Sequence, residues 1–244
     1  MGAHLTKARR MGTIDIYGGR DPKKVPAYSI TSAARYLQLP ATTVRDWVAG
    51  RTFPTKAGVG RSAPIILAAD PDRYILSFQN LVEVYVLSAI RRERVPLDRV
   101  RRAVENLSKE FHTDHPLADK EIFTVGRSMV IDELGKVVDA ASGQLSIRRV
   151  VAAHLKRIEK DPHGVPIRIY PSSTGVAAAP GRAIAIDPRV QFGRPCIAKT
   201  SVPTEIVASR YKAGDSREAL ARDYRLTVDQ IEEALRYEIP RQAA

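Results

Sequence analysis

The chain is poor in cysteine and aromatic residues and has no long apolar run. A single cysteine, Cys196, stands among 244 residues, so an intramolecular disulfide is excluded and a reducing compartment is favoured. No apolar stretch reaches the roughly 18 residues that a membrane helix needs. Residues 1–10 carry charges without the apolar segment of a secretory signal. We therefore expect a cytoplasmic protein that does not enter a membrane, with Cys196 buried for structural reasons.

Recognisable catalytic and metal-binding sets are missing as well. The carboxylates are scattered without a paired arrangement, and residues 58–62 lack the spacing of a phosphate-binding loop. His112 and His115 stand without a cysteine or third histidine nearby, which is too few ligands for zinc. His154 falls on an apolar helix face, where a core histidine is expected. The sequence thus predicts no enzyme, no metal and no cofactor.

Positive charge, by contrast, is plentiful. Lysine and arginine total 39 against 27 aspartate and glutamate, a formal net charge of +12, while 44% hydrophobic residues suffice for a globular core. Eight of these twelve excess charges lie in residues 1–62. A basic excess concentrated in one segment indicates a polyanionic partner, most often nucleic acid, at that part of the chain.

Apolar residues at helical spacing predict a mainly α-helical fold with small β elements. Thr31 is expected to cap a first helix, which ends before Leu39-Pro40. A second helix spans about 41–49, and Gly50 ends it. Its inward positions are Val44, Trp47 and Val48. Two short helices joined by a turn of three or four residues are typical of a helix-turn-helix.

The next segment predicts a hairpin and two longer helices. The apolar runs 65–67 and 74–76 flank a turn and are interpreted as a β-hairpin or wing. Ser77 is expected to cap a helix from residue 79 to about 94, which is apolar almost all round and so lies in a core or at a dimer contact. A further amphipathic helix spans 97–111.

The chain divides into five segments by composition and pattern. A basic arm with a short strand (1–27) precedes the helix-turn-helix segment (28–112), and a small α+β region (113–170) follows it. Residues 171–180 form a linker, and 181–244 form a compact helical unit. Within these segments the expected features are strands at 123–132 and 165–170, a helix at 147–158, and helices at 216–224 and 228–238 with capping boxes beginning at Asp215 and Thr227.

A helix-turn-helix binds DNA because its second helix fits the major groove. With the apolar side of helix 41–49 facing inward, the side chains left to face outward are Thr42, Thr43, Arg45 and Asp46. Arg45 can pair with guanine through two hydrogen bonds. Beyond the helix, phosphate or minor-groove contacts are expected from Arg51, Lys56 and Arg61.

The order of these parts resembles the winged-helix DNA-binding domain of the MerR family over about 28–105. The resemblance rests on Ser32-Ala33-Ala34-Arg35-Tyr36-Leu37, Thr43-Val44-Arg45-Asp46-Trp47, Phe53-Pro54, Arg73-Tyr74 and Pro96-Leu97-Asp98-Arg99-Val100. It implies that Thr43-Val44-Arg45 is the recognition segment. The family usually has two aromatic residues where this chain has Asp46-Trp47.

The C-terminal unit is similar to the small domain of VapB-type antitoxins over about 181–238. The motifs are Ile186-Asp187-Pro188, Gly193-Arg194-Pro195-Cys196-Ile197, Thr200 and Val202-Pro203, followed by two capped helices. Lys199 stands where that family usually has glycine, and Ser201 where it has arginine. The resemblance implies a second helix-turn-helix, for which the expected DNA-binding residues are Lys199, Thr200, Arg210 and Lys212.

Together the resemblances imply the antitoxin of a type II toxin–antitoxin pair. Its partners would be a PIN-domain toxin ribonuclease, double-stranded operator DNA and a second copy of the chain, because paired half-sites double the contacts of a short recognition helix. Two alternatives stay open. One is a ligand-responsive regulator without a toxin, with residues 123–170 as its sensor. The other is an enzyme that acts on nucleic acid.

Overall fold

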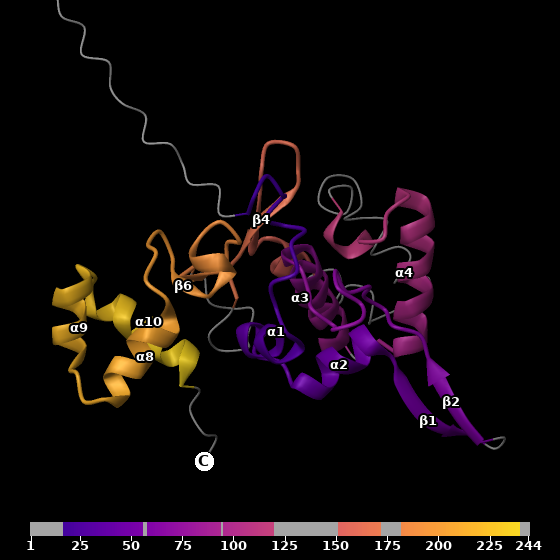
Figure 1. The fold of residues 1–244 in the computed structure, drawn as a ribbon, viewed down its shortest axis with the longest axis horizontal. Coiled ribbons are helices and arrows are strands. Elements are labelled where there is room, and N and C mark those ends of the chain that lie inside the picture. The colour runs from indigo at the N-terminus through magenta and orange to yellow at the C-terminus, as the bar shows by residue number, and fades with distance from the viewer. Residues whose placement is uncertain (1–16, 56–57, 94, 120–150, 172–181, 240–244) are drawn as a thin grey trace, which may run out of the picture.

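The computed structural model describes residues 17–55, 58–93, 95–119, 151–171 and 182–239. It has the expected fold class, helices with small antiparallel sheets (Figure 1). None of the described helices combines the length and apolarity needed to cross a bilayer. Figure 1 shows α1–α4 with a projecting hairpin at one end of the molecule and α8–α10 at the other.

The N-terminal part consists of helices around one long central helix. Its elements are α1 (Ile30–Leu37), α2 (Ala41–Ala49), β1 (Arg51–Thr55), β2 (Gly58–Ser62), α3 (Phe78–Arg92), α4 (Leu97–Phe111) and the 3-10 turn η1 (Pro116–Ala118). Helix α3 is buried almost all round within the chain, with Leu81, Val84 and Leu87 fully inaccessible. The structure therefore assigns its apolar surface to the core and not to a dimer contact.

The remaining elements connect this part to a second unit. They are β3 (Ile158–Lys160), β4 (Pro166–Ile169), β5 (Ile184–Ala185), η2 (Gln191–Gly193), β6 (Cys196–Ile197), α8 (Thr204–Lys212), α9 (Arg217–Tyr224) and α10 (Val228–Glu238). The described strands form antiparallel pairs β1–β2, β3–β4 and β5–β6. A single bridge between Ile169 and Ile186 joins β4 to the second unit, whose helices enclose a core of their own.

Local signals predicted most of the helices correctly. The bounds of α2 and α4 are those expected, and Ser77 caps α3 with a complete capping box. Thr227 and Gln230 form the predicted capping box of α10. His154 is buried beside the ring of Tyr85, 5.2 Å between centroids, as a core histidine should be.

Other local predictions were wrong. The cap of α1 is Ser29 and not Thr31, and the cap of α9 is Ser216 and not Asp215, because in each helix the serine hydroxyl accepts from the backbone N–H three residues on. The helix expected over 147–158 ends by residue 155, and Ile158 opens β3 instead. The strand expected at 123–132 lies outside the described residues, as does most of the one in the arm.

The predicted hairpin at 65–76 was also wrong. Its two apolar runs lie in or near the core without forming strands, since only the bridge Asp70–Ile75 joins them. The hairpin is β1–β2, which pairs Arg51 with Ser62 and Thr55 with Gly58. All five residues of β1 are exposed, so the alternation of buried and exposed side chains that marks a strand is absent.

The two units also contact each other through α1. Arg35 forms ion pairs with Glu205 at 3.0 Å and Glu238 at 3.6 Å. The buried hydroxyl of Tyr237 donates to the carbonyl of Tyr36, and the amide of Gln38 donates to the carbonyl of Tyr237 at 3.1 Å. These contacts join the first helix of the N-terminal part to α8 and α10.

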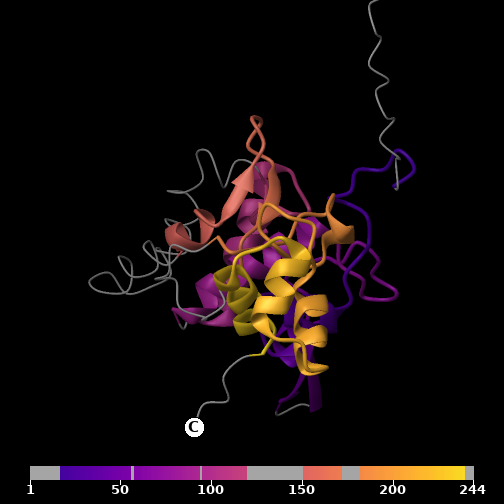
Figure 2. The ribbon, with the colours of Figure 1, turned by 90° about the vertical axis from the view of Figure 1, so that its left-hand side faces the viewer.

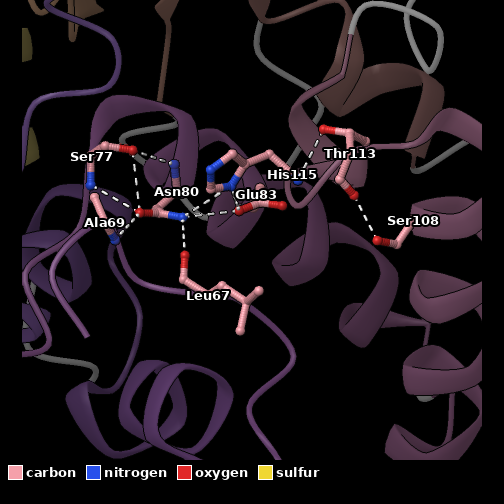
Figure 3. A network of polar contacts seen from close by, with 8 residues as sticks. All are labelled: Leu67, Ala69, Ser77, Asn80, Glu83, Ser108, Thr113 and His115. Atoms are coloured by element: carbon pink, nitrogen blue, oxygen red, sulfur yellow. Dashed lines mark hydrogen bonds and ion pairs between the residues drawn. The ribbon is translucent and has the colours of Figure 1, made fainter. Parts of the chain in front are cut away.

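A buried polar network fixes α3 to the segments around it (Figure 3). The Asn80 amide nitrogen donates to the Leu67 carbonyl at 2.8 Å and to Glu83 Oε2 at 3.1 Å. Its oxygen accepts from the backbone N–H groups of Ala69 and Ser77, both at 3.0 Å. His115 Nδ1 lies 3.1 Å from the same Glu83 oxygen. The network thus holds two segments against α3: the one that contains His115, between α4 and η1, and the one that contains Leu67 and Ala69, after β2.

This network predicts a pH-dependent stability. The hydrogen bond to Glu83 raises the pKa of His115, and burial raises the pKa of Glu83. Asp114 and Lys24 also face the imidazole and act in opposite directions on its pKa. Because both pKa values are raised by folding, the stabilisation is present at low pH and is lost as pH rises through the folded pKa of His115, above 6.5.

We expect the free energy of unfolding, measured by urea denaturation, to fall between pH 6 and pH 8. His115→Gln keeps a hydrogen-bonding side chain but does not titrate, so it should flatten this dependence. The variant His112→Gln is the matched control, since His112 lies on the exposed side of the same segment. An equal pH dependence in His115→Gln and the wild type would contradict this assignment.

Candidate DNA-binding surface

The first two helices meet at a tight turn. Gln38 adopts a left-handed conformation with φ of 54°, and the Leu39 N–H donates to the Ala34 carbonyl at 2.8 Å, which ends α1. Pro40 then starts α2, where its missing N–H costs no helical hydrogen bond. Three residues, Gln38 to Pro40, thus separate the helices, as expected of a helix-turn-helix.

Helix α2 has one buried face and one open face. Val44, Trp47 and Val48 are buried in the core, at 0 to 3% exposure. Thr42 and Arg45 are exposed, while Thr43 and Asp46 are partly exposed. The Arg45 guanidinium forms no hydrogen bond or ion pair with the rest of the described chain, so its donors are available to an external acceptor.

The β1–β2 hairpin follows α2 directly and projects from the same part of the molecule. Figures 1 and 2 show it extending beyond the helices at the lower edge of both views. Arg51 and Arg61 are exposed on it, and Lys56 lies outside the described residues. The predicted residues of α2 and these two arginines are therefore brought together at one end of the N-terminal part.

Gly50 makes the junction between α2 and the hairpin possible. Its φ is +77°, and a Cβ at this position would lie 2.2 Å from the Ser62 carbonyl oxygen. Backbone atoms cannot yield as a flexible side chain can, so only glycine fits here. Below the junction, the Trp47 carbonyl accepts from the N–H groups of Ile65 and Ile66 at 2.7 and 3.1 Å. The hairpin is therefore anchored to the end of α2 from both of its strands.

Arg101 supports the same junction from α4. Its guanidinium donates to the carbonyls of Ala63 and Pro64, the latter at 3.1 Å. The apolar stripe of α4 leaves this arginine on the outer face of its helix. Its contact partners precede it by 38 and 37 residues. The residue pattern of one helix does not predict a contact between residues so far apart in the sequence.

The four DNA-binding residues predicted for the C-terminal unit lie apart from α2 and the β1–β2 hairpin. The guanidinium of Arg210 pairs with Asp215 at 2.6 Å and Asp223 at 2.7 Å, so its charge is already balanced. Lys212 is exposed at the end of α8. Lys199 and Thr200 line a cleft beside β4 and β6. The structure thus does not gather these four residues with α2 and the β1–β2 hairpin.

The other residues that could carry out chemistry, Cys196 and the histidines, have structural roles. Cys196 is 3% exposed, and burial raises the pKa of its thiol to about 11, so it is held in the unreactive form. No group of three metal-ligating side chains gathers in the described ranges. His115 belongs to the Glu83 network and not to a pair with His112.

Two family models match the chain. One is described as "Putative DNA-binding HTH domain" and covers residues 26–104. The other is described as "Protein of unknown function (DUF433)" and covers residues 184–237. The first match coincides with α1, α2, the β1–β2 hairpin and α3, which carry the surface described above. The N-terminal part is therefore a helix-turn-helix domain.

A curated relative extends the similarity to nearly the whole chain. "Putative antitoxin VapB45" of Mycobacterium tuberculosis (strain ATCC 25618 / H37Rv) is 30% identical over 229 residues, which cover 86% of this chain and 93% of the relative. The chain belongs to the VapB45 family. A second relative from the same organism, "Uncharacterized protein Rv2308", is 26% identical over 221 residues, 86% of this chain and 89% of that protein.

A solved structure shows the same fold. The crystal structure of Rv2018 from Mycobacterium tuberculosis superposes with a TM-score of 0.63 at 26% identity and covers 86% of this chain and 97% of that chain. The similarity therefore includes both the helix-turn-helix domain and the C-terminal unit. In this chain the helix-turn-helix match precedes the DUF433 match.

Proposed function

We propose that the chain is the antitoxin of a type II toxin–antitoxin pair, and that it binds operator DNA to repress its own operon. The observation that carries the DNA-binding step is the open face of α2, with Arg45 unpaired among the described residues, beside the arginines of the β1–β2 hairpin. Membership of the VapB45 family supports the antitoxin role. No catalytic step is assigned to the chain.

On operator DNA, α2 enters the major groove and the β1–β2 hairpin lies along the neighbouring backbone, as in a MerR-like winged helix. Arg45 reads a guanine edge, with Thr42, Thr43 and Asp46 beside it. Arg51 and Arg61, with Lys56, neutralise phosphates. Two copies bind as a homodimer to half-sites one helical turn apart, because a nine-residue helix alone makes few base contacts.

The toxin contact is assigned to the C-terminal unit. Phe192 on η2 is 58% exposed, and Arg189 and Arg194 flank it in sequence. Within the chain Arg189 pairs with Asp187 and Arg194 with Glu205. To bind an acidic active-site cleft such as that of a PIN-domain ribonuclease, these arginines would exchange their partners for its carboxylates while the apolar ring covers the cleft. Lys212, exposed at the end of α8, would then serve the partner or flanking DNA.

The toxin step is tested by affinity purification of the tagged chain from its native cells, followed by mass spectrometry. We expect a stoichiometric small protein with clustered acidic residues, released by Phe192→Ala with Arg194→Ala. Val59→Ala, which changes an 81% exposed side chain on β2, is the control for surface truncation. Recovery of the chain alone with DNA would contradict the antitoxin role and favour a ligand-responsive regulator.

That second candidate function has one observation in its favour. A cleft of about 520 Å³ opens where β4 meets the C-terminal unit, and small-molecule sites are commonly of this size. It lies partly in the region that the sequence marked as a sensor, since Arg168 of β4 is one of its walls.

A further inference from the structure

The cleft between β4 and the C-terminal unit is lined by both apolar and polar residues. Ala185, Val190 and Cys196 supply the apolar surface, and Ala185 and Cys196 are buried. The other lining residues are Arg168, Asp187, Lys199, Thr200 and Ser201. An apolar surface with a few convergent polar groups is the ordinary make-up of a small-molecule site.

The charged groups of the cleft leave one cation in excess. Asp187 is 3% exposed and accepts from both Arg168 and Arg189, at 2.9 and 2.8 Å. Arg168 also pairs with Glu159 at 2.8 Å. Burial alone would raise the pKa of Asp187, but the hydrogen bonds from Arg189 outweigh it and lower that pKa, so the carboxylate stays charged. Two guanidinium groups thus balance two carboxylates.

Lys199 is the cation that remains. It is exposed at the mouth of the cleft, and its ammonium group has no hydrogen bond or ion pair within the described ranges. The turn beneath it is fixed by Thr200, whose hydroxyl donates to the Ile197 carbonyl at 2.8 Å and accepts from the Val202 N–H at 3.1 Å. A hydrogen-bonded turn therefore carries the Lys199 side chain at the cleft, and Ser201 of the same turn also lines the cleft.

We propose that this cleft binds a small organic anion, with its carboxylate or phosphate group at Lys199 and Ser201 and its apolar body over Ala185, Val190 and Cys196. The ligand would bridge β4 and the β6–α8 turn of the C-terminal unit. Figure 1 shows β4 toward the upper edge of the molecule and the β1–β2 hairpin at the lower edge, so this site is separate from the DNA-binding surface.

The test uses phenyl phosphate and benzoate as probes of the two anionic groups, with amide chemical shifts measured during titration of the full chain. Sodium chloride at matched ionic strength is the blank. We expect saturable shifts confined to residues lining the cleft for at least one probe, and weaker binding of inorganic phosphate, which lacks an apolar body. Shifts that do not saturate for either probe, or that spread over α9 and α10, would overturn the proposal.

Lys199→Gly is a variant that should remove the ammonium group without lowering the stability of the fold. Lys199 has a φ of 64°, a conformation that glycine adopts without strain, so the melting temperature should be no lower than that of the wild type. Loss of the ammonium group should weaken probe binding about tenfold or more. Lys109→Ala removes an exposed charge on α4, outside the cleft, and should bind as the wild type does. Equal affinity of Lys199→Gly and wild type would contradict the site.

Discussion

Arg45→Ala is expected to weaken binding of the preferred DNA site by about 5- to 150-fold, which corresponds to about 1–3 kcal/mol for a bidentate guanine contact. Arg45 is the exposed arginine of α2 and makes no other bond among the described residues, so its loss should not disturb the fold. The preferred site is first selected from random duplexes with the wild-type protein. Affinities are then measured by fluorescence anisotropy at several salt concentrations.

The controls separate base recognition from general electrostatics. Arg222→Ala removes the same charge from α9, at the far end of the molecule from the β1–β2 hairpin in Figure 1, and should leave the affinity nearly unchanged. Arg61→Ala should weaken all duplexes alike and reduce the salt slope by about 1. Only Arg45→Ala should also relax the preference at one base pair. Unaltered affinity and preference in Arg45→Ala would remove α2 from the recognition role.

Gly50→Ala is expected to lower the free energy of unfolding by about 2 to 4 kcal/mol, since it combines left-handed backbone strain with overlap in a packed region. The added methyl group would lie 2.2 Å from the Ser62 carbonyl oxygen. Relief of this overlap must move the β1–β2 hairpin away from α2. DNA affinity should therefore fall together with stability, and both are measured on the same preparation by urea denaturation and anisotropy.

Gly60→Ala is the matched control. An added methyl group there meets side-chain atoms of Phe53 and Thr55 at 2.9 Å, and these side chains can rotate away because both are exposed. Its effect on stability and binding should be small. A Gly50→Ala protein as stable as Gly60→Ala, with wild-type DNA affinity, would show that the junction does not set the position of the hairpin.

Local chemistry made the helices predictable. Trp47 and its neighbours repeat at helical spacing, and Ser77 and Thr227 cap the helices that follow them. Capping is decided by hydrogen bonds within three residues, so its signal is local in the sequence. The errors at Thr31 and Asp215 arose where two neighbouring residues could each cap, and the sequence does not indicate which will adopt extended backbone angles.

The β1–β2 hairpin and the long-range contacts of Arg35 and Arg101 were not predictable from the sequence pattern. Residues of β1 are all exposed, so no alternation marks the strand, whereas the apolar runs near Ile66 and Leu76 are apolar because they enter the core. Arg35 meets Glu205 across 170 positions, and Arg101 meets Pro64 across 37. Such contacts follow from the packing of whole elements, which charge and periodicity do not specify.

The most direct test of the account is to locate α2 on DNA with a chemical probe. Thr42→Cys places a reactive thiol on the open face of α2, whereas the native Cys196 is buried with a raised pKa and should resist labelling. An iron–EDTA cleavage reagent is attached to the new thiol and DNA carrying the selected site is added. Arg222→Cys, labelled in the same way, is the reference.

The account predicts cleavage by the Thr42→Cys conjugate confined to a few base pairs within the selected site, and little cleavage by the Arg222→Cys conjugate. Cleavage spread evenly along the duplex from Thr42→Cys, or localised cleavage from Arg222→Cys alone, would contradict the assignment of α2 as the DNA-reading helix.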